Sequence, residues 1–307
     1  MLRRAIPTRE RPRSHGRKRT AHWTPHAAAH RAPDEMRVPF VKMHGLGNDF
    51  VVLDAREQSL LPMTGALAAA LADRHTGIGC DQLILLEPSQ TADFRMRIFN
   101  ADGSEVEACG NATRAVGLLH GRPARIETAA GLVSASPAED GISVEMGKPR
   151  FAWNEIPLAY AMDAQAMPVA WEALENPIAV NVGNPHVVFF VKDCDAVELE
   201  RLGPEIERDP LFPERINVNV ATVTGRDAIR LRVWERGAGL TLACGTGACA
   251  TAIAAMRRGL TDRRVTVTLP GGPLVIEWRD DDEIVMTGPA VESFRGSFDP
   301  AAFGAAP

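Results

Sequence analysis

The tripeptide Ala-Cys-Gly occurs twice in this chain, at Cys109 and at Cys244, which lie 135 residues apart. Cysteine can carry a proton as a thiol and accept one as a thiolate, so a pair of cysteines is a candidate for acid and base catalysis. An alanine-rich run follows each cysteine and ends at Gly121 or Gly259. Glycine commonly follows the last turn of a helix. We therefore predict that each cysteine lies at the N-terminus of a helix.

A helix N-terminus carries unpaired backbone N–H groups and a partial positive charge. It can bind a carboxylate and can lower a cysteine pKa below its ordinary value of about 8.5. Gly110 and Gly245 follow the cysteines, so a ligand can approach the backbone. Two such helix ends facing each other would place one thiol on either side of the carbon next to a carboxylate. This arrangement predicts inversion of a stereocentre, in which one thiolate removes a proton and the opposite thiol returns one.

The repeated cysteines have three alternative interpretations, which stay open: inert core residues inherited twice, a metal pair and a redox disulfide. Neither cysteine has another cysteine or histidine at ligand spacing in its segment, which weakens the metal alternative. Cys249 follows Cys244 by five residues and would point to another face of the helix. We predict structural roles for Cys80, Cys194 and Cys249, which have no counterpart in the other half.

An internal duplication extends beyond the cysteines. Residues 94–100 and 229–235 both alternate apolar and polar side chains, as half-buried strands do. The same offset of 135 residues aligns Gln82 with Asn217, and an offset of 136 residues aligns Asn48 with Asn184. We predict an α/β (α+β) fold with two pseudo-symmetric domains, each a mixed, mostly antiparallel sheet wrapped around a central helix.

The predicted strands are Val38–Lys42, Phe50–Asp54, Gln82–Leu86, Ile178–Val182, Val187–Val191, Asn217–Val223 and Val265–Leu269, and the predicted helices outside the cysteine segments are Thr64–Arg74 and Val197–Glu207. A segment rich in proline and charge near 148–157 indicates a crossing between domains. We expect a disordered basic extension over 1–35, a first half over 36–152 completed by 288–307, and a second half over 153–287.

Charge is distributed unevenly. Residues 1–35 hold nine of the 34 Lys and Arg residues and three of the 39 Asp and Glu residues, so the body is acidic. The extension is interpreted as a disordered tail or upstream sequence before a start at Met36, with a transit peptide or nucleic-acid-binding arm as alternatives. The acidic body predicts no nucleic-acid binding, and the apolar runs are too short for a transmembrane helix. Irregularly spaced cysteines favour a reducing cytoplasm.

At these residues the sequence resembles the diaminopimelate epimerase family. The segments that carry the resemblance span most of the body: Lys42–Phe50, Asp73–Gln82, Arg97–Glu105, Ala108–Asn111, Gly183–His186, Arg215–Asn217, Arg232–Gly237 and Leu242–Gly247. Two departures, Ala112-Thr113 where the family commonly has Gly-Ala and Cys80 where it commonly has phenylalanine, remove no functional group.

The resemblance implies interconversion of LL- and meso-2,6-diaminopimelate in lysine and peptidoglycan synthesis, with no cofactor, no metal and a small-molecule substrate; a homodimer is left open. Cys109 and Cys244 match the acid/base pair of the family, and His186 and Glu235 match groups that tune the thiols. The matching substrate-binding residues are Asn48, Gln82, Asn100, Gly110, Asn111, Asn184, Asn217, Glu235, Arg236, Gly245 and Thr246. Glu235 and Arg236 fall on Asn100 and Ala101 of the first half, so the second half adds one acid and one base that suit a distal amino-acid end.

Two more enzyme classes and one non-enzymatic class are weighed against this resemblance. A proline or hydroxyproline racemase also uses two opposed thiols, but Arg236 and the many Asn and Gln donors argue against a simple monocarboxylic substrate. A non-enzymatic thiol or binding protein is the alternative from another class. A pyridoxal phosphate enzyme is disfavoured, because the body holds only Lys42, Lys148 and Lys192, none of them in a recognisable Schiff-base setting.

Overall fold

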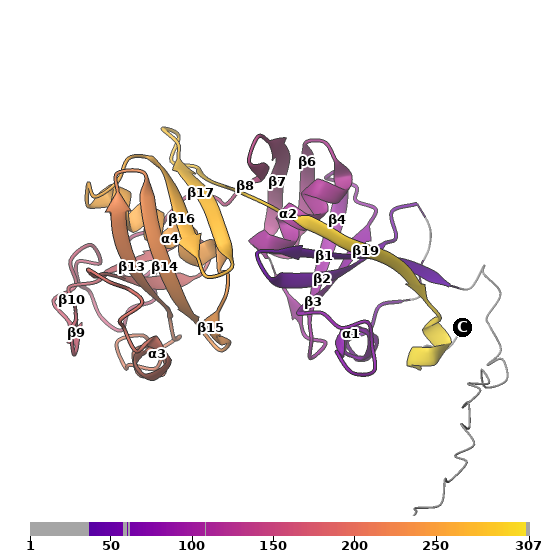
Figure 1. The fold of residues 1–307 in the computed structure, drawn as a ribbon, viewed down its shortest axis with the longest axis horizontal. Coiled ribbons are helices and arrows are strands. Elements are labelled where there is room, and N and C mark those ends of the chain that lie inside the picture. The colour runs from indigo at the N-terminus through magenta and orange to yellow at the C-terminus, as the bar shows by residue number, and fades with distance from the viewer. Residues whose placement is uncertain (1–36, 58–59, 61, 108, 305–307) are drawn as a thin grey trace, which may run out of the picture.

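A computed structural model describes residues 37–57, 60, 62–107 and 109–304. The predicted basic extension over 1–35 lies outside the described residues. The chain forms two α/β halves side by side, the first drawn in indigo to magenta and the second in orange to yellow (Figure 1). Each half wraps sheet strands around one long helix, so the predicted fold class is confirmed.

The first half begins with strand β1 and ends with β8. Its elements are β1 (Val38–Gly45), β2 (Asn48–Asp54), α1 (Gly65–Ala72), β3 (Gln82–Glu87), β4 (Phe94–Asn100), β5 (Glu105–Val106), α2 (Gly110–His120), β6 (Ala124–Thr128), β7 (Gly131–Ala138) and β8 (Gly141–Glu145). The central helix is α2.

The second half repeats this order after a short hairpin, β9 (Ala170–Trp171) and β10 (Leu174–Glu175). Its elements are β11 (Ile178–Asn181), β12 (Pro185–Phe190), α3 (Leu199–Glu207), β13 (Asn217–Gly225), β14 (Ala228–Glu235), β15 (Gly239–Thr241), α4 (Gly245–Arg257), β16 (Arg264–Leu269), β17 (Gly272–Trp278) and β18 (Ile284–Gly288). The central helix is α4, and β19 (Val291–Phe298) and a 3₁₀ turn (Pro300–Phe303) follow.

Strand pairing repeats between the halves. In the first half β2 is parallel to β3, β3 is antiparallel to β4, and β4 is parallel to β6. In the second half β12, β13, β14 and β16 pair in the same senses. Gln82 lies opposite Phe50 and Asn217 opposite His186, so the polar residues matched by the sequence offset begin equivalent strands. The duplication in the sequence is therefore a duplication of topology.

The halves are joined by their own last strands. β8 pairs antiparallel with β18, and the sheet runs on from one half into the other. β19 then crosses back and pairs with β1 along most of its length (Figure 1). The boundary placed between residues 152 and 153 stays a prediction, because one continuous sheet connects the two sides.

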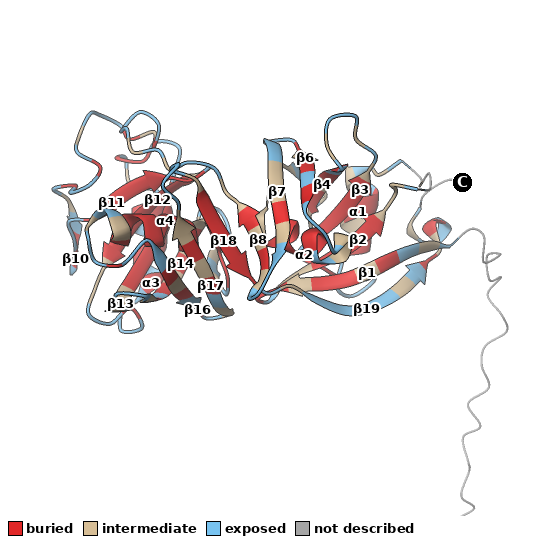
Figure 2. Cartoon of the chain, turned by 90° about the horizontal axis from the view of Figure 1, so that it is seen from above, coloured by how far each residue is buried: buried red, intermediate tan, exposed pale blue. Residues whose placement is uncertain are grey.

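Both central helices are rich in small residues because the sheets surround them. Along α4, Ala250, Ala252 and Ala254 are fully buried. In α2, a Cβ on Gly117 would lie 2.9 Å from Ile142 of β8, so glycine lets the helix approach the sheet. Figure 2 shows the buried colour concentrated on these helices and the strands around them, with β19 largely exposed. Within the described part of the chain, the helices are too short or too polar to cross a bilayer.

Candidate active site

Cys109 and Cys244 are the N-cap residues of α2 and α4, each with an extended backbone conformation. The prediction that each cysteine begins a helix is therefore confirmed. The Gly247 N–H donates to Cys244 Sγ at 3.3 Å, and the Thr246 hydroxyl lies 3.5 Å from the same sulfur. Cys109 is partly exposed, and its Sγ lies 4.0 Å from Asn48 Oδ1. Both thiols thus lie where helix N–H groups converge.

The glycines after the two cysteines pack on one side chain. A Cβ on Gly110 would lie 2.8 Å from Met286 Cε, and a Cβ on Gly245 would lie 3.0 Å from Met286 Sδ. Met286 is in β18, the strand that joins the halves, and is fully buried. The starts of α2 and α4 therefore meet on Met286, and glycine is needed there for packing as well as for access of a ligand to the backbone.

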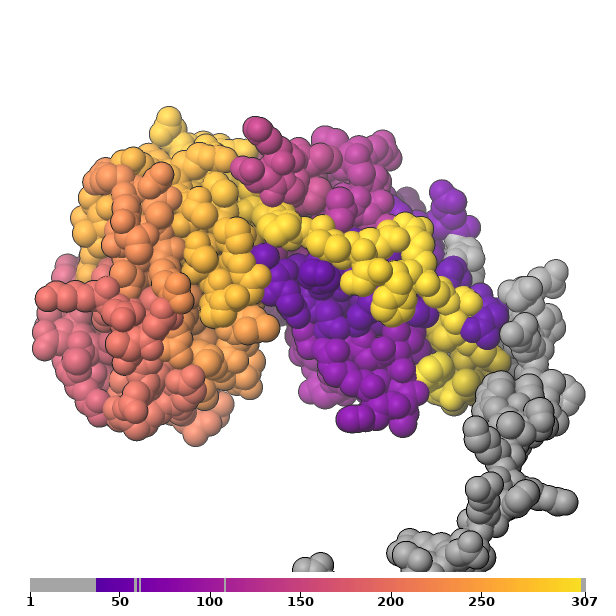
Figure 3. Space-filling view, viewed as in Figure 1, coloured from indigo at the N-terminus to yellow at the C-terminus, as the bar shows by residue number. Residues whose placement is uncertain are grey.

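A cavity of about 1600 Å³ opens between the halves, and both cysteines line it. Figure 3 shows the hollow between the two halves. The predicted site residues that line it are Asn48, Gln82, Asn100, Cys109, Gly110, Asn111, Asn184, Glu235, Arg236, Cys244, Gly245 and Thr246. Residues far apart in sequence and on separate halves thus share one cleft, as ligand sites between domains commonly do.

Two predicted site residues, His186 and Asn217, lie buried behind the lining rather than in it. His186 Nε2 lies 2.9 Å from Asn184 Oδ1, and Asn217 Oδ1 accepts the backbone N–H of Arg236 at 2.9 Å. Each therefore holds a residue that does line the cleft.

The tautomer of His186 follows from its second neighbour. The Asn219 amide nitrogen donates to the Val187 carbonyl and lies 3.1 Å from His186 Nδ1, so Nδ1 accepts a hydrogen bond. The Nε2 proton is then donated to Asn184. Burial lowers the pKa of His186 to about 3, so the ring is neutral at physiological pH.

Amide side chains converge beside α2 in the first half. The Asn111 amide nitrogen donates to Asn48 Oδ1 at 3.2 Å, and the Gln82 amide nitrogen donates to Asn100 Oδ1 at 3.2 Å. These groups come from β2, β3, β4 and α2, the strands and helix that the duplication matched. They supply neutral donors and acceptors at the cleft wall.

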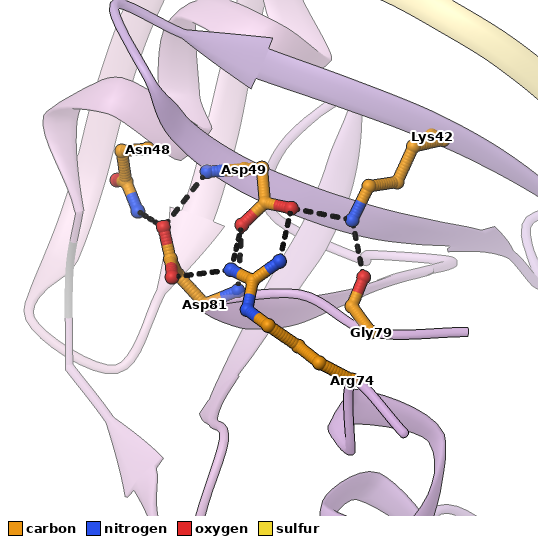
Figure 4. A network of polar contacts seen from close by, with 6 residues as sticks. All are labelled: Lys42, Asn48, Asp49, Arg74, Gly79 and Asp81. Atoms are coloured by element: carbon orange, nitrogen blue, oxygen red, sulfur yellow. Dashed lines mark hydrogen bonds and ion pairs between the residues drawn. The ribbon is translucent and has the colours of Figure 1, made fainter. Parts of the chain in front are cut away.

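An ion-pair network that the sequence analysis did not single out supports Asn48 (Figure 4). The Asn48 amide nitrogen donates to Asp81 at 3.1 Å, and Arg74 lies 2.7 Å from Asp81 and 2.6 Å from Asp49. Lys42 pairs with Asp49 at 2.6 Å and also donates to the Gly79 carbonyl. Burial raises the pKa of Asp49, but hydrogen bonds from Arg74 and Lys42 outweigh burial and hold it below its ordinary value. Two signals were available: Asp49 and Asp81 adjoin Asn48 and Gln82 in sequence, and the network lies within the segments Lys42–Phe50 and Asp73–Gln82 that carry the family resemblance.

The expectation that the helix ends lower both thiol pKa values is wrong for this structure. Burial raises the pKa of Cys109, and the N–H groups of Ala112 and Asn111 offset only part of that rise. Burial raises the pKa of Cys244 further, and the nearby Glu235 carboxylate adds to the rise. Loss of hydration therefore outweighs the helix N-terminus, and both cysteines are protonated thiols at neutral pH.

The second half adds charge to the cleft. The Thr241 hydroxyl donates to Glu235 Oε1 at 2.5 Å, which holds the carboxylate beside Cys244. Arg236 is exposed, and its Nη1 donates to the Glu214 carbonyl at 3.0 Å. Arg236 has no carboxylate partner among the described residues, so its charge is available to an anionic ligand.

Together these groups can bind a small zwitterion and move protons on two sides of it. Helix N–H groups suit a carboxylate, and two thiols on separate halves can serve as acid and base. In the part of the chain that the structure describes, His, Cys, Asp and Glu residues form no cluster suited to a metal ion. Cys80, Cys194 and Cys249 are buried away from the cleft lining.

Comparison with known proteins identifies a sequence family. The sequence profile described as "Diaminopimelate epimerase" matches residues 40–152 and 178–292. A diaminopimelate epimerase of Erythrobacter litoralis is 72% identical over 264 residues, which cover 86% of this chain and 98% of that protein. One of Zymomonas mobilis is 59% identical over 269 residues, which cover 87% of this chain and all of that protein.

Solved structures share the fold at much lower identity. A PhzF-family phenazine biosynthesis protein of Bacillus anthracis aligns with a TM-score of 0.62 and 16% identity, covering 85% of this chain and 99% of that one. A hydroxyproline epimerase of Agrobacterium vitis aligns with a TM-score of 0.59 and 16% identity, covering 86% and 91%. At these identities the likeness extends to the fold alone.

Proposed function

The chain belongs to the diaminopimelate epimerase family, and from that premise we propose that it interconverts LL- and meso-2,6-diaminopimelate without a cofactor. The observation that carries the proposal is the pair of cysteines, Cys109 and Cys244, that cap equivalent helices of the two halves and line one cleft. The reaction supplies meso-diaminopimelate for lysine and peptidoglycan synthesis. Five free cysteines suit the reducing cytoplasm in which we place it.

Proton transfer needs one thiolate and one thiol at the start. The substrate α-carboxylate binds at the N-termini of α2 and α4, among the backbone N–H groups of Gly110, Asn111, Gly245 and Thr246. One cysteine, as thiolate, removes the α-proton, and the other, as thiol, returns a proton to the opposite face. Negative charge that develops on the carboxylate oxygens is stabilised by the same N–H groups.

The remaining contacts divide between the two ends of the substrate. Glu235 and Arg236, present only in the second half, recognise the ammonium and carboxylate of the distal amino-acid end, with Asn217 holding the Arg236 backbone. Asn48, Gln82, Asn100, Asn111 and Asn184 supply the neutral polar contacts. His186 acts as a neutral group that orients Asn184, and Glu235 tunes Cys244.

Incubation of the purified protein with LL-diaminopimelate, followed by chiral analysis, tests the proposal. Conversion to the meso isomer with no conversion of L-proline or trans-4-hydroxy-L-proline is the expected result. Conversion of L-proline or trans-4-hydroxy-L-proline alone would favour the proline or hydroxyproline racemase alternative. No conversion of any of them would favour the non-enzymatic class.

A further inference from the structure

Arg114 is fully buried and is the largest such side chain among the described residues. It lies one turn into α2, next to the Cys109 end. No carboxylate in the described residues pairs with it, although a buried cation without an anion is costly. Burial lowers the pKa of Arg114 to about 10, so it stays charged at neutral pH.

Its guanidinium contacts several segments that build the cleft. Arg114 Nη2 donates to Asn111 Oδ1 at 2.8 Å, Nη1 lies 3.5 Å from Met286 Sδ, and Nε lies 3.4 Å from the Pro289 carbonyl. A Cβ on Gly45 would lie 3.2 Å from Nη2, so glycine leaves the room that the guanidinium occupies. Arg114 thus links α2 to β18 and to the connection between β18 and β19, and its guanidinium lies close to Gly45 of β1.

A directed chain of hydrogen bonds starts at this cation. Because Asn111 Oδ1 accepts from Arg114, its amide nitrogen is left to donate to Asn48 Oδ1. The Asn48 amide nitrogen then donates to the Asp81 carboxylate. Every bond runs from the cation toward the anion, an order in which neighbouring hydrogen bonds strengthen one another. The chain fixes which atom each amide presents at the mouth of α2.

The second half does not repeat this arrangement. The offset of 135 places Cys249 at the position of Arg114, Thr246 at that of Asn111 and Ile216 at that of Asp81. Asn184, the counterpart of Asn48, is held by neutral His186 instead. The two thiols are therefore supported by different groups, and only the Cys109 side has a buried cation among the described residues.

We propose that Arg114 is a positioning residue of this active site, whose guanidinium orients the Asn111–Asn48 amides and supplies the positive charge that favours an anion at the Cys109 end of the cleft. The inference rests on the proposed epimerase function. Two charged groups act on the Cys109 pKa: Arg114 in α2 lowers it, and Glu235 in β14 raises it. The other charged or titratable groups of the cleft wall are Lys42, His44, Asp49, Arg74, Asp81, Glu105, Glu107, Glu145, Arg236 and Cys244, and the Cys249 thiol of α4 interacts electrostatically with Arg114.

Thiol alkylation by iodoacetamide across pH, resolved by peptide mass spectrometry, tests this inference without any substrate. Arg114→Gln keeps an amide donor and loses the charge, Arg114→Met loses both, and Arg114→Lys keeps the charge. We expect the Cys109 alkylation midpoint to rise by ~1 pH unit in the Gln and Met variants and to stay near the parent value in the Lys variant. The Cys244 midpoint, read in the same samples, should move less.

Cys249→Ala is the matched control, since it changes the equivalent buried position of α4, and it should leave both midpoints unchanged. If the Arg114→Met variant does not fold, the Cys109 midpoint of the Arg114→Gln variant alone tests the inference. Unchanged midpoints in the Gln variant, or equal shifts at both cysteines, would overturn the inference. If the parent protein converts diaminopimelate but the Gln variant shows no Cys109 shift, only the role of Arg114 is refuted. If the Cys109 midpoint shifts in the variants but the parent protein does not convert diaminopimelate, only the proposed function is refuted.

Discussion

At the scale of single residues, the two cysteines match in sequence but differ in surroundings. Cys109 is partly exposed beside the Asn48 amide, whereas Cys244 is buried beside Glu235 and accepts an N–H from Gly247. The pseudo-symmetric frame thus holds two thiols with unequal environments.

Replacing either cysteine should remove one partner in the proton transfer. We expect Cys109→Ala and Cys244→Ala each to lower kcat on the order of 10³-fold, because acid and base are both required in each direction. Cys194→Ala, which changes a buried cysteine outside the cleft, is the control. Circular dichroism should show intact folds, and more than a tenth of parental turnover in either active-site variant would contradict the two-thiol mechanism.

The raised thiol pKa values predict how activity depends on pH. Both cysteines are protonated at neutral pH, and the fraction with one thiolate grows as pH rises toward the raised pKa values. The kcat/KM for LL-diaminopimelate should therefore increase from pH 7 to pH 9. Initial rates in buffers of constant ionic strength measure this, and a flat or falling profile over that range would count against thiolate as the base.

Arg236 is expected to hold the distal carboxylate through two N–H groups. Arg236→Lys keeps the charge but loses the planar fork, so kcat/KM should fall roughly 10-fold to 100-fold, mainly through KM. Arg226→Lys is the control, since Arg226 is an exposed arginine paired with Asp262 outside the cleft. Equal kinetics for the two variants would reduce Arg236 to a surface charge.

Sequence patterns predicted which side chains meet in the cleft but not how burial acts on them. The repeat and the family motifs pointed to Asn48, Cys109, Asn184 and Cys244, all of which line it. The direction of the thiol pKa shifts was wrong, because desolvation depends on tertiary packing that a motif does not contain. Arg114 was missed for the same reason, since a basic residue in a helix gives no sign of burial.

At the scale of elements, packing of both helix starts on Met286 explains why glycine follows each cysteine. We expect Gly110→Ala to cost about 1 kcal/mol in the free energy of unfolding, the low end for overpacking, because the new Cβ would lie 2.8 Å from Met286 Cε, the flexible end of a side chain that must shift. Chemical denaturation measures the cost. Met286→Ala makes room, so the double variant should be less destabilised than the two single changes added together. Strict additivity would show that Met286 is not the obstacle.

Long elements were predictable and very short ones were not. Strands were predicted in the ranges of β1, β2, β3 and β13, where several apolar residues follow one another, and a helix was predicted in the range of α1. β5, β9 and β10 span two residues each, too few for any periodicity to be visible. These two-residue strands form because the surrounding tertiary structure positions them.

At the scale of the whole molecule, the duplication in sequence predicted two similar halves but not the pairing of β8 with β18 that joins them. The join is made by β8 with β18, equivalent strands that pair across the boundary, and by β19 lying on β1. The edge of a strand pairs through backbone groups, so its sequence does not indicate which strand it pairs with. This join places the N-termini of α2 and α4 on the same cleft, which neither half could do alone.

The two-thiol mechanism is tested most directly by the deuterium content of substrate and product early in the reaction in deuterated water. LL-diaminopimelate is mixed with the protein, and both isomers are analysed by mass spectrometry before a tenth has been converted. Two opposed thiols take the proton from one face and deliver a solvent-derived deuteron to the other. We therefore predict one deuterium in the meso product and none in the remaining substrate. Product that keeps its original proton would show that a single group moves the proton between faces, and would contradict the two-thiol site.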